Sequence, residues 1–187
     1  MLHRRDVVSQ ILSRRENLLV VAGLGSTAWD ITAAGDSPLS FPLWGAMGQA
    51  AMIGLGLALA QPKRPVLVIT GDGEMLMGLG ALATIGVQQP KNLSVVVIDN
   101  ERYGETGMQA THTAHGVDLA AVARACRIAN AITVSEGSGL EPLRAQVHAC
   151  NGPTFVAVKV RAEKLPLALP PLDGVLLKDR FRKALLG

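Results

Sequence analysis

The sequence predicts an α/β domain of the doubly wound type, in which helices flank a mostly parallel sheet. Short apolar segments rich in β-branched residues alternate along the chain with longer segments whose apolar residues recur at helical spacing. The short segments are apolar at nearly every position, as is typical of parallel strands that are buried on both faces. With 187 residues, of which 49% are hydrophobic and 18% charged, the chain has the length and composition of one well-buried domain.

The elements are expected in the alternating order that this fold requires. A first amphipathic helix is indicated by Val7, Val8, Ile11 and Leu12, which share one face at helical spacing. Strands are expected over residues 18–22, 66–70, 93–98, 131–134 and 154–160, and further helices over residues 43–60, 74–85, 119–128 and 140–150. The proline-rich residues 165–171 predict a linker to a short basic helix. We therefore divide the chain into a domain of residues 1–164 and a tail of residues 165–187, which docks on this domain or on a partner.

Two polar turns follow two of the predicted strands. A Gly-Asp-Gly turn at residues 71–73 ends one strand, and Asn100 follows the next. Parallel strands joined by a right-handed crossover end at the same edge of the sheet, so we expect Asp72 and Asn100 to lie close together. A carboxylate and an amide oxygen are hard ligands that suit Mg²⁺, while the glycines and the helix that starts near Glu74 favour a phosphate group. The residues by themselves predict a site for a diphosphate and a metal ion.

This pair of turns resembles the cofactor signature of the thiamine diphosphate enzymes, in which GDG precedes an asparagine by roughly 25 to 30 residues. Residues 74–99 provide a spacing of 26 here. Residues 20–31 resemble the first strand and turn of the same family, and residues 41–60 resemble the segment that holds the aminopyrimidine ring. The resemblance implies the thiamine diphosphate-binding fold, with thiamine diphosphate and Mg²⁺ as cofactors.

The resemblance also implies roles for individual residues. Mg²⁺ would be held by Asp72, by the Asn100 side chain and by the backbone carbonyl of Arg102. In catalysis, the Gly45 carbonyl would accept a hydrogen bond from the 4-amino group of the cofactor, and Met47 would lie between its two rings and keep them bent. The remaining cofactor-binding residues that the resemblance implies are Gly25, Ser26, Thr27, Ala46, Gly71, Gly73, Glu74 and Tyr103.

Five residues near the site leave its chemistry open. Glu74 stands where many relatives have a small hydroxyl residue, so its carboxylate is expected to turn away from the diphosphate or to be offset by a cation. Arg102 replaces a frequent glycine, and its side chain is expected in solvent or against an anionic group. Glu105 replaces a small residue in a loop that borders the substrate. His112 and His115 could transfer protons near the substrate, although a polar loop is the favoured interpretation.

The resemblance further implies a partner chain. Members of the family need a second domain, which binds the pyrimidine ring and provides a glutamate that activates it, and residues 1–187 contain only the diphosphate-binding domain. Residues 103–128 resemble the beta subunit of sulfopyruvate decarboxylase and the matching half of phosphonopyruvate decarboxylase. This implies a decarboxylase of a small 2-oxo acid, with a pyrimidine-binding alpha-type subunit as partner in a hetero-oligomer. The alternatives are a carboligase, an oxidative relative, or a cofactor-binding subunit without catalytic activity.

Other classes of protein fit the sequence less well. An aromatic content of 3% and a net charge of +3 argue against a nucleic-acid partner. The GxGxxA pattern at residues 23–28 imitates a dinucleotide fingerprint but lacks the acidic residue expected after the next strand. The uncharged residues 43–60 are barely long enough to span a bilayer, and their glycines favour a helix packed within a protein. Cys126 and Cys150 lack the spacing of a metal site, and no secretory signal is visible, so we expect a cytoplasmic protein.

Overall fold

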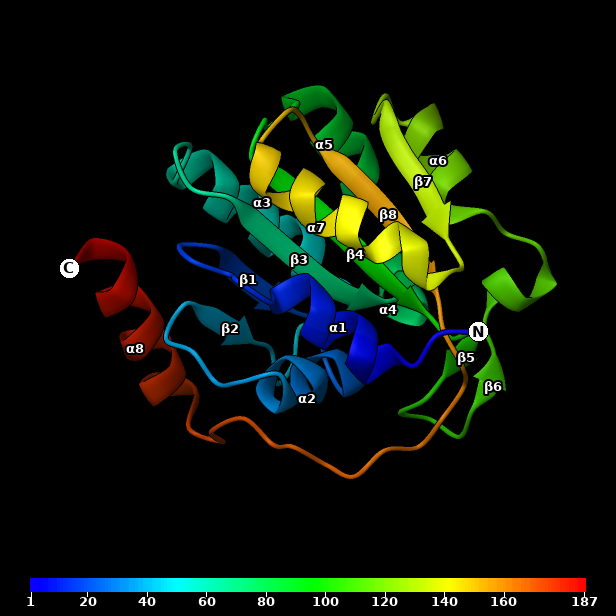
Figure 1. The fold of residues 1–187 in the computed structure, drawn as a ribbon, viewed down its shortest axis with the longest axis horizontal. Helices are drawn as coiled ribbons and strands as arrows, with labels where there is room; N and C mark the ends of the chain where they lie inside the picture. The colour runs from blue at the N-terminus through cyan, green and yellow to red at the C-terminus, as the bar shows by residue number, and fades with distance from the viewer.

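The apolar segments form one sheet of six parallel strands in the computed structural model, which describes residues 1–187 (Figure 1). The strands are β1 (Leu19–Ala22), β2 (Ser40–Pro42), β3 (Val66–Gly71), β4 (Leu93–Asp99), β7 (Asn130–Val134) and β8 (Thr154–Lys159). Their order across the sheet is β2-β1-β3-β4-β8-β7, and all neighbours are parallel. The predicted doubly wound α/β fold is confirmed. The sequence does not predict the edge strand β2, because three residues that end in a proline carry no strand pattern.

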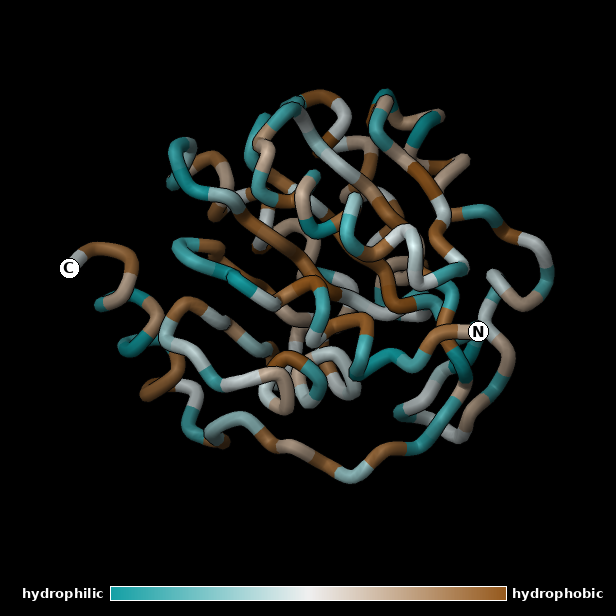
Figure 2. The backbone as a smooth tube through the Cα atoms, viewed as in Figure 1, coloured by the Kyte–Doolittle hydropathy of each residue, from teal (hydrophilic) through white to brown (hydrophobic).

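Helices cover both faces of this sheet. They are α1 (Arg4–Leu12), α2 (Ser26–Ala33), α3 (Ala50–Ala60), α4 (Asp72–Met77), α5 (Ala81–Gln88), α6 (Leu119–Ala125), α7 (Leu140–Ala149) and α8 (Gly174–Leu186). Alternate strand residues point to opposite faces, so Val20 packs with α1 and α7, while Val21 packs with α3 and α5. In Figure 1, α1 and α7 lie in front of the sheet and α3 and α5 behind it. Figure 2 shows the most hydrophobic stretches of the chain in the strands between these layers.

Two of the expected helices differ from the structure. The single helix over residues 74–85 is instead α4 and α5, which are separated by a turn at residues 78–80. The break coincides with a close contact at Gly78, where the carbonyl oxygen of Gly48 lies so near that a Cβ would clash with it. The helix over residues 43–60 is reduced to α3, since Ala46 and Gly48 have φ angles of 59° and 85°, which no α-helix contains. None of the helices is both long enough and apolar enough to cross a membrane.

The tail lies against the same domain. Residues 161–173 run along the outside of α2 in an extended form, and α8 packs beside the edge strand β2 (Figure 1). The rings of Phe41 and Phe181 are 5.2 Å apart between centroids, and Arg180 pairs with Asp36. The indole Nε1 of Trp44 donates a hydrogen bond of 2.9 Å to the carbonyl of Pro171. These contacts cover β2, which would otherwise expose one edge of the sheet.

Candidate functional site

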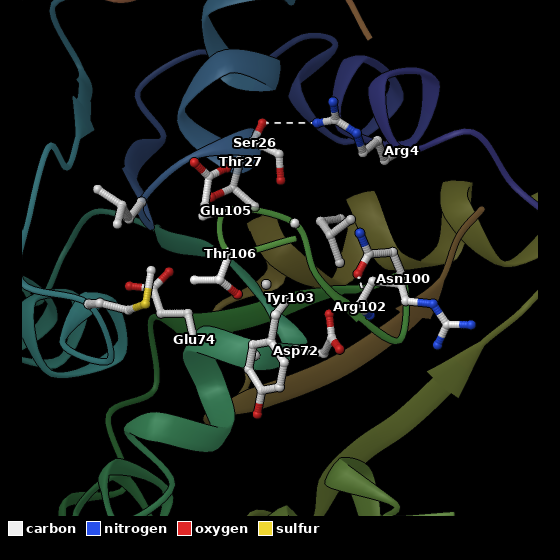
Figure 3. Close-up of a pocket in the computed structure, with 16 residues that line it drawn as sticks. Arg4, Ser26, Thr27, Asp72, Glu74, Asn100, Arg102, Tyr103, Glu105 and Thr106 are labelled. Atoms are coloured by element: carbon white, nitrogen blue, oxygen red, sulfur yellow. Dashed lines mark hydrogen bonds between the residues drawn. The ribbon is translucent and has the colours of Figure 1, made fainter. Parts of the chain in front are cut away.

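The candidate site lies where the strand order reverses. The chain passes from β1 outward to β2 and then returns to β3 on the other side of β1, so a crevice opens between the carboxyl ends of β1 and β3. A pocket of about 80 Å³ occupies this crevice, between the turn after β1, the start of α4 and the loop after β4 (Figure 3). The predicted site residues that line it are Ser26, Thr27, Met47, Gly71, Asp72, Gly73, Glu74, Asn100, Arg102, Tyr103 and Glu105.

Asp72 is the buried carboxylate of this pocket. It begins α4 directly after β3 and is only 1% exposed. The Thr111 hydroxyl donates a hydrogen bond of 2.6 Å to its Oδ2, and no lysine or arginine pairs with it. Burial raises the pKa of Asp72; the Thr111 hydrogen bond opposes this rise, and the charge of Asp99 adds to it. A buried carboxylate without a cation is costly, so the site fits an ion that would supply positive charge.

Asn100 and Arg102 reach the same pocket from the loop after β4. The Asn100 Oδ1 accepts a hydrogen bond of 2.9 Å from the Arg102 N–H, and Glu101 between them has a left-handed φ of 61°. Figure 3 places Asp72, Asn100 and Arg102 together on one side of the pocket. The Arg102 guanidinium donates to the Glu101 carbonyl at 2.9 Å. No cluster of three histidine, cysteine, aspartate or glutamate side chains is present, so a metal here would depend on amide and carbonyl oxygens besides Asp72.

Glu74 lies on the opposite side of the pocket, and its carboxylate is turned into the protein (Figure 3). The Thr70 hydroxyl donates to its Oε2 at 2.7 Å, and the Gly48 N–H donates to its Oε1 at 3.3 Å. Gly23 leaves the space for this carboxylate, because a Cβ at that position would overlap with it. Burial raises the pKa of Glu74, and these hydrogen bonds oppose the rise. The side chain therefore joins the turn after β1, the loop before α3 and the end of β3.

The remaining predicted residues lie at the margin of the pocket or outside it. Gly45 and Ala46 are in the exposed turn before α3 and do not line the pocket, in contrast to Met47. His112 and His115 are exposed in a short 3-10 helix outside the lining, where His112 Nδ1 lies 3.3 Å from the Tyr103 hydroxyl.

Glu105 reaches over the turn after β1. Glu105 is exposed, and its carboxylate lies against Gly25. Gly25 is not part of the pocket lining, but its left-handed φ of 75° shapes this turn. Figure 3 shows Glu105 beside Ser26 and Thr27, at the start of α2. An anion at this helix end would meet the Glu105 carboxylate.

Arg4 also lines the pocket, although it is not among the site residues that the sequence analysis predicts. Arg4 is only 3% exposed; its Nη1 pairs with Asp30 and donates a hydrogen bond of 3.1 Å to the Ser26 carbonyl (Figure 3). Arg5 pairs with Asp30 as well. Burial raises the pKa of Asp30, and the charges and hydrogen bonds of Arg4 and Arg5 oppose the rise. A signal was present in the sequence, because Arg4 lies three and four residues before the buried Val7 and Val8 and so shares their helix face.

The comparisons with known proteins agree with this geometry. A family model described as the C-terminal TPP binding domain of thiamine pyrophosphate enzymes matches residues 25–158. Sulfopyruvate decarboxylase subunit beta of Methanothermobacter thermautotrophicus is 38% identical over 187 residues, which cover 100% of this chain and 97% of that protein. Phosphonopyruvate decarboxylase of Streptomyces viridochromogenes is 39% identical over 164 residues, which cover 87% of this chain but 41% of that protein.

A solved structure supports the fold alone. The crystal structure of benzoylformate decarboxylase from Polynucleobacter necessarius matches 89% of this chain and 34% of its own chain, with a TM-score of 0.73 and 20% sequence identity. The shared arrangement therefore extends over nearly all of the present domain and one part of the larger protein.

Proposed function

Because the chain belongs to the thiamine pyrophosphate enzymes, through their C-terminal cofactor-binding domain, we propose that it is the diphosphate-binding subunit of a two-chain 2-oxo acid decarboxylase. The observation that carries this proposal is the joint presence of Asp72 and Asn100 in one pocket at the carboxyl edge of the sheet. The full-length match to a decarboxylase subunit beta supports the reaction and the two-chain form. Among 2-oxo acids, those with a second acid group, such as sulfopyruvate, are the first candidates as substrate.

In this proposal, the pocket residues hold the cofactor by its diphosphate. Asp72, the Asn100 side chain and the Arg102 carbonyl would hold Mg²⁺, and the backbone at Gly73 would hold the diphosphate. Ser26 at the start of α2 would join this site once the exposed Glu105 carboxylate has turned away. When bound, thiamine diphosphate would supply an electron sink for the electron pair that the carbon–carbon bond leaves behind as carbon dioxide departs. Met47 also lines the pocket and, with the apolar segment that follows, would exclude water from the reacting atoms.

A partner is proposed because this chain does not enclose the cofactor by itself. Its pocket of about 80 Å³ is well below the roughly 300–1,000 Å³ of typical small-molecule sites. The phosphonopyruvate decarboxylase contains the matched region as 41% of its length, so the remainder of that chain provides room for a second domain. We infer that a separate pyrimidine-binding subunit plays this part here and brings the glutamate that activates the cofactor.

The surface of α3, α4 and α5 suits such a partner. Residues 37–62 and 75–90 contain no charged side chain, and α3 is apolar on all sides although its outer face is not covered. A helix that is hydrophobic all round is normally buried. The large side chains of Leu59, Met77 and Val87 are 51%, 61% and 70% exposed. This surface continues to the pocket through α4, so a protein docked there would also close the cofactor site.

The test is the activity of the assembled complex. The chain is co-expressed with the product of the neighbouring reading frame, and aldehyde release is measured from a panel of 2-oxo acids with and without thiamine diphosphate and Mg²⁺. We expect turnover that requires both chains and both cofactors and that is abolished by Asp72→Ala but not by Asp179→Ala, a change on the exposed side of α8. Turnover that persists in Asp72→Ala contradicts the proposal.

Assays of the same complex also distinguish the three alternative functions. Capture of a second carbonyl compound in place of aldehyde release would favour a carboligase, and transfer of electrons to an added acceptor would favour an oxidative enzyme. A complex that binds the cofactor but forms no product with any acid would favour a non-catalytic subunit.

A further inference from the structure

Lys159 connects the two acidic residues that flank Asn100. It is the last residue of β8 and lies opposite Asp99, the last residue of β4, in the parallel register. Its Nζ is 2.8 Å from Asp99 Oδ2 and 2.8 Å from Glu101 Oε1. Neither contact can be read from the sequence, because Lys159 is about 60 residues further along the chain. One ammonium group thus holds the chain immediately before and immediately after Asn100.

The same network reaches Asp72. The Thr113 hydroxyl donates a hydrogen bond of 2.8 Å to Asp99 Oδ1 and lies 3.3 Å from Asp72 Oδ2. The Glu101 N–H also donates to Asp99 Oδ1, at 3.2 Å. Asp99 is 2% exposed, whereas the side chains of Lys159 and Glu101 are 28% and 36% exposed, so the network runs from the buried edge of the sheet to the surface. The contacts join the start of α4 to the ends of β4 and β8 at the edge of the sheet where the pocket lies.

We propose that Lys159 is a positioning residue, which holds Asn100 and the Arg102 carbonyl in place opposite Asp72 through its contacts with Asp99 and Glu101. This inference rests on the proposed function, since it assigns Lys159 to the proposed metal-binding loop. Lys159 is not among the residues that line the pocket. Without it, Asp99 and Glu101 would repel each other and the loop would lose the ion pairs that determine its path.

Two effects of removing Lys159 have opposite signs, and this makes the inference testable. Loss of a nearby positive charge alone would attract Mg²⁺ more strongly to the site. If the loop moved from its position, Mg²⁺ binding would weaken, because mutation of residues that orient metal ligands typically lowers the metal affinity by about 10- to 100-fold. The direction of the change therefore separates positioning from simple electrostatics.

The experiment compares Lys159→Met and Lys159→Arg with Lys164→Met in the assembled complex. Lys164 is exposed beside a neighbouring cavity that shares Asn100 with the pocket, so its loss makes the same change in charge near the site. The Mg²⁺ dissociation constant is measured at saturating thiamine diphosphate by the fluorescence of Trp29 and Trp44. We expect binding at least about tenfold weaker in Lys159→Met, recovery in Lys159→Arg, and no weakening in Lys164→Met. Equal or tighter binding in Lys159→Met overturns the inference.

A second readout needs no cofactor. The amide protons of Glu101 and Arg102 donate to the side chains of Asp99 and Asn100, so their hydrogen exchange reports the order of the loop in the free chain. We expect faster exchange at both amides in Lys159→Met, with unchanged exchange at Val96 in the core of β4. Unchanged exchange at Glu101 and Arg102 would also overturn the inference. If the wild-type complex binds no thiamine diphosphate, the proposed function fails, and the exchange data still decide whether Lys159 positions the loop.

Discussion

At the scale of single residues, the site depends on buried carboxylates that lack a cationic partner. Asp72 and Glu74 begin the same short helix, but their side chains diverge: Asp72 accepts from Thr111, while Glu74 accepts from Thr70 and Gly48. Burial raises the pKa of both groups. The first carboxylate thus remains available for a metal ion, whereas the hydrogen bonds of the second are used to hold the loop that carries Met47.

The raised pKa of Glu74 predicts a dependence of stability on pH. The folded chain holds the Glu74 proton more tightly than the unfolded chain, so this group makes the free energy of unfolding fall as the pH rises from the usual carboxyl range through the raised pKa. In Glu74→Gln this contribution disappears, so the decline of the free energy of unfolding above the usual carboxyl range becomes shallower. Urea unfolding at a series of pH values measures the slope. The exposed Glu136→Gln is the control, and equal slopes in both variants would contradict the prediction.

At the scale of elements, the turn between α4 and α5 determines where the Met47 loop lies. Gly78 packs directly on the Gly48 carbonyl, and Gly48 in turn donates its N–H to Glu74. The apolar pattern over residues 74–85 indicates one helix, because apolar periodicity contains no information about a close approach from another segment. The short α4 therefore ends where two turns pack on each other, and of these two the one that carries Met47 borders the pocket.

Gly78→Ala is expected to destabilise the chain by about 1–3 kcal/mol, because its Cβ would force the Gly48 carbonyl to move. Gly80→Ala is the matched control two residues away: nothing lies near its Cβ and its φ is −60°, so we expect no loss and a gain of up to about 1 kcal/mol. Chemical denaturation of the two variants gives both values. The prediction fails if Gly78→Ala is as stable as Gly80→Ala.

At the scale of the whole molecule, the parallel sheet brings the ends of β1, β3 and β4 to one edge, where α4 contributes Asp72, Gly73 and Glu74 to the pocket. The uncharged surface of α3, α4 and α5 reaches the pocket through α4. The tail and α8 lie beside β2 (Figure 1). Leu185 of α8 packs against the core cluster that contains α3, so the contacts that protect the sheet edge adjoin the proposed partner surface.

A charge on the uncharged surface is expected to weaken the complex without unfolding the chain. Met77→Glu, at a side chain that is 61% exposed on α4, should raise the dissociation constant for the partner at least tenfold, or roughly 1.4 kcal/mol. Val175→Glu, at a side chain that is 64% exposed on α8, is the control and should leave the dissociation constant unchanged. Sedimentation measures the complex, and circular dichroism checks the fold. A larger effect from Val175→Glu would move the proposed interface to α8.

The sequence by itself determined the parallel α/β fold, because the apolar pattern of each strand and helix is local and the crossover rule leaves few ways to connect them. It also supplied the grounds for placing Asp72 and Asn100 at one edge, since both directly follow strands. Only the tertiary structure decided the direction of the Glu74 carboxylate, the burial of Arg4 against Ser26 and Asp30, and the contact of Lys159 with Asp99. These depend on contacts between distant segments, whose energies exist only once the strands and helices have packed.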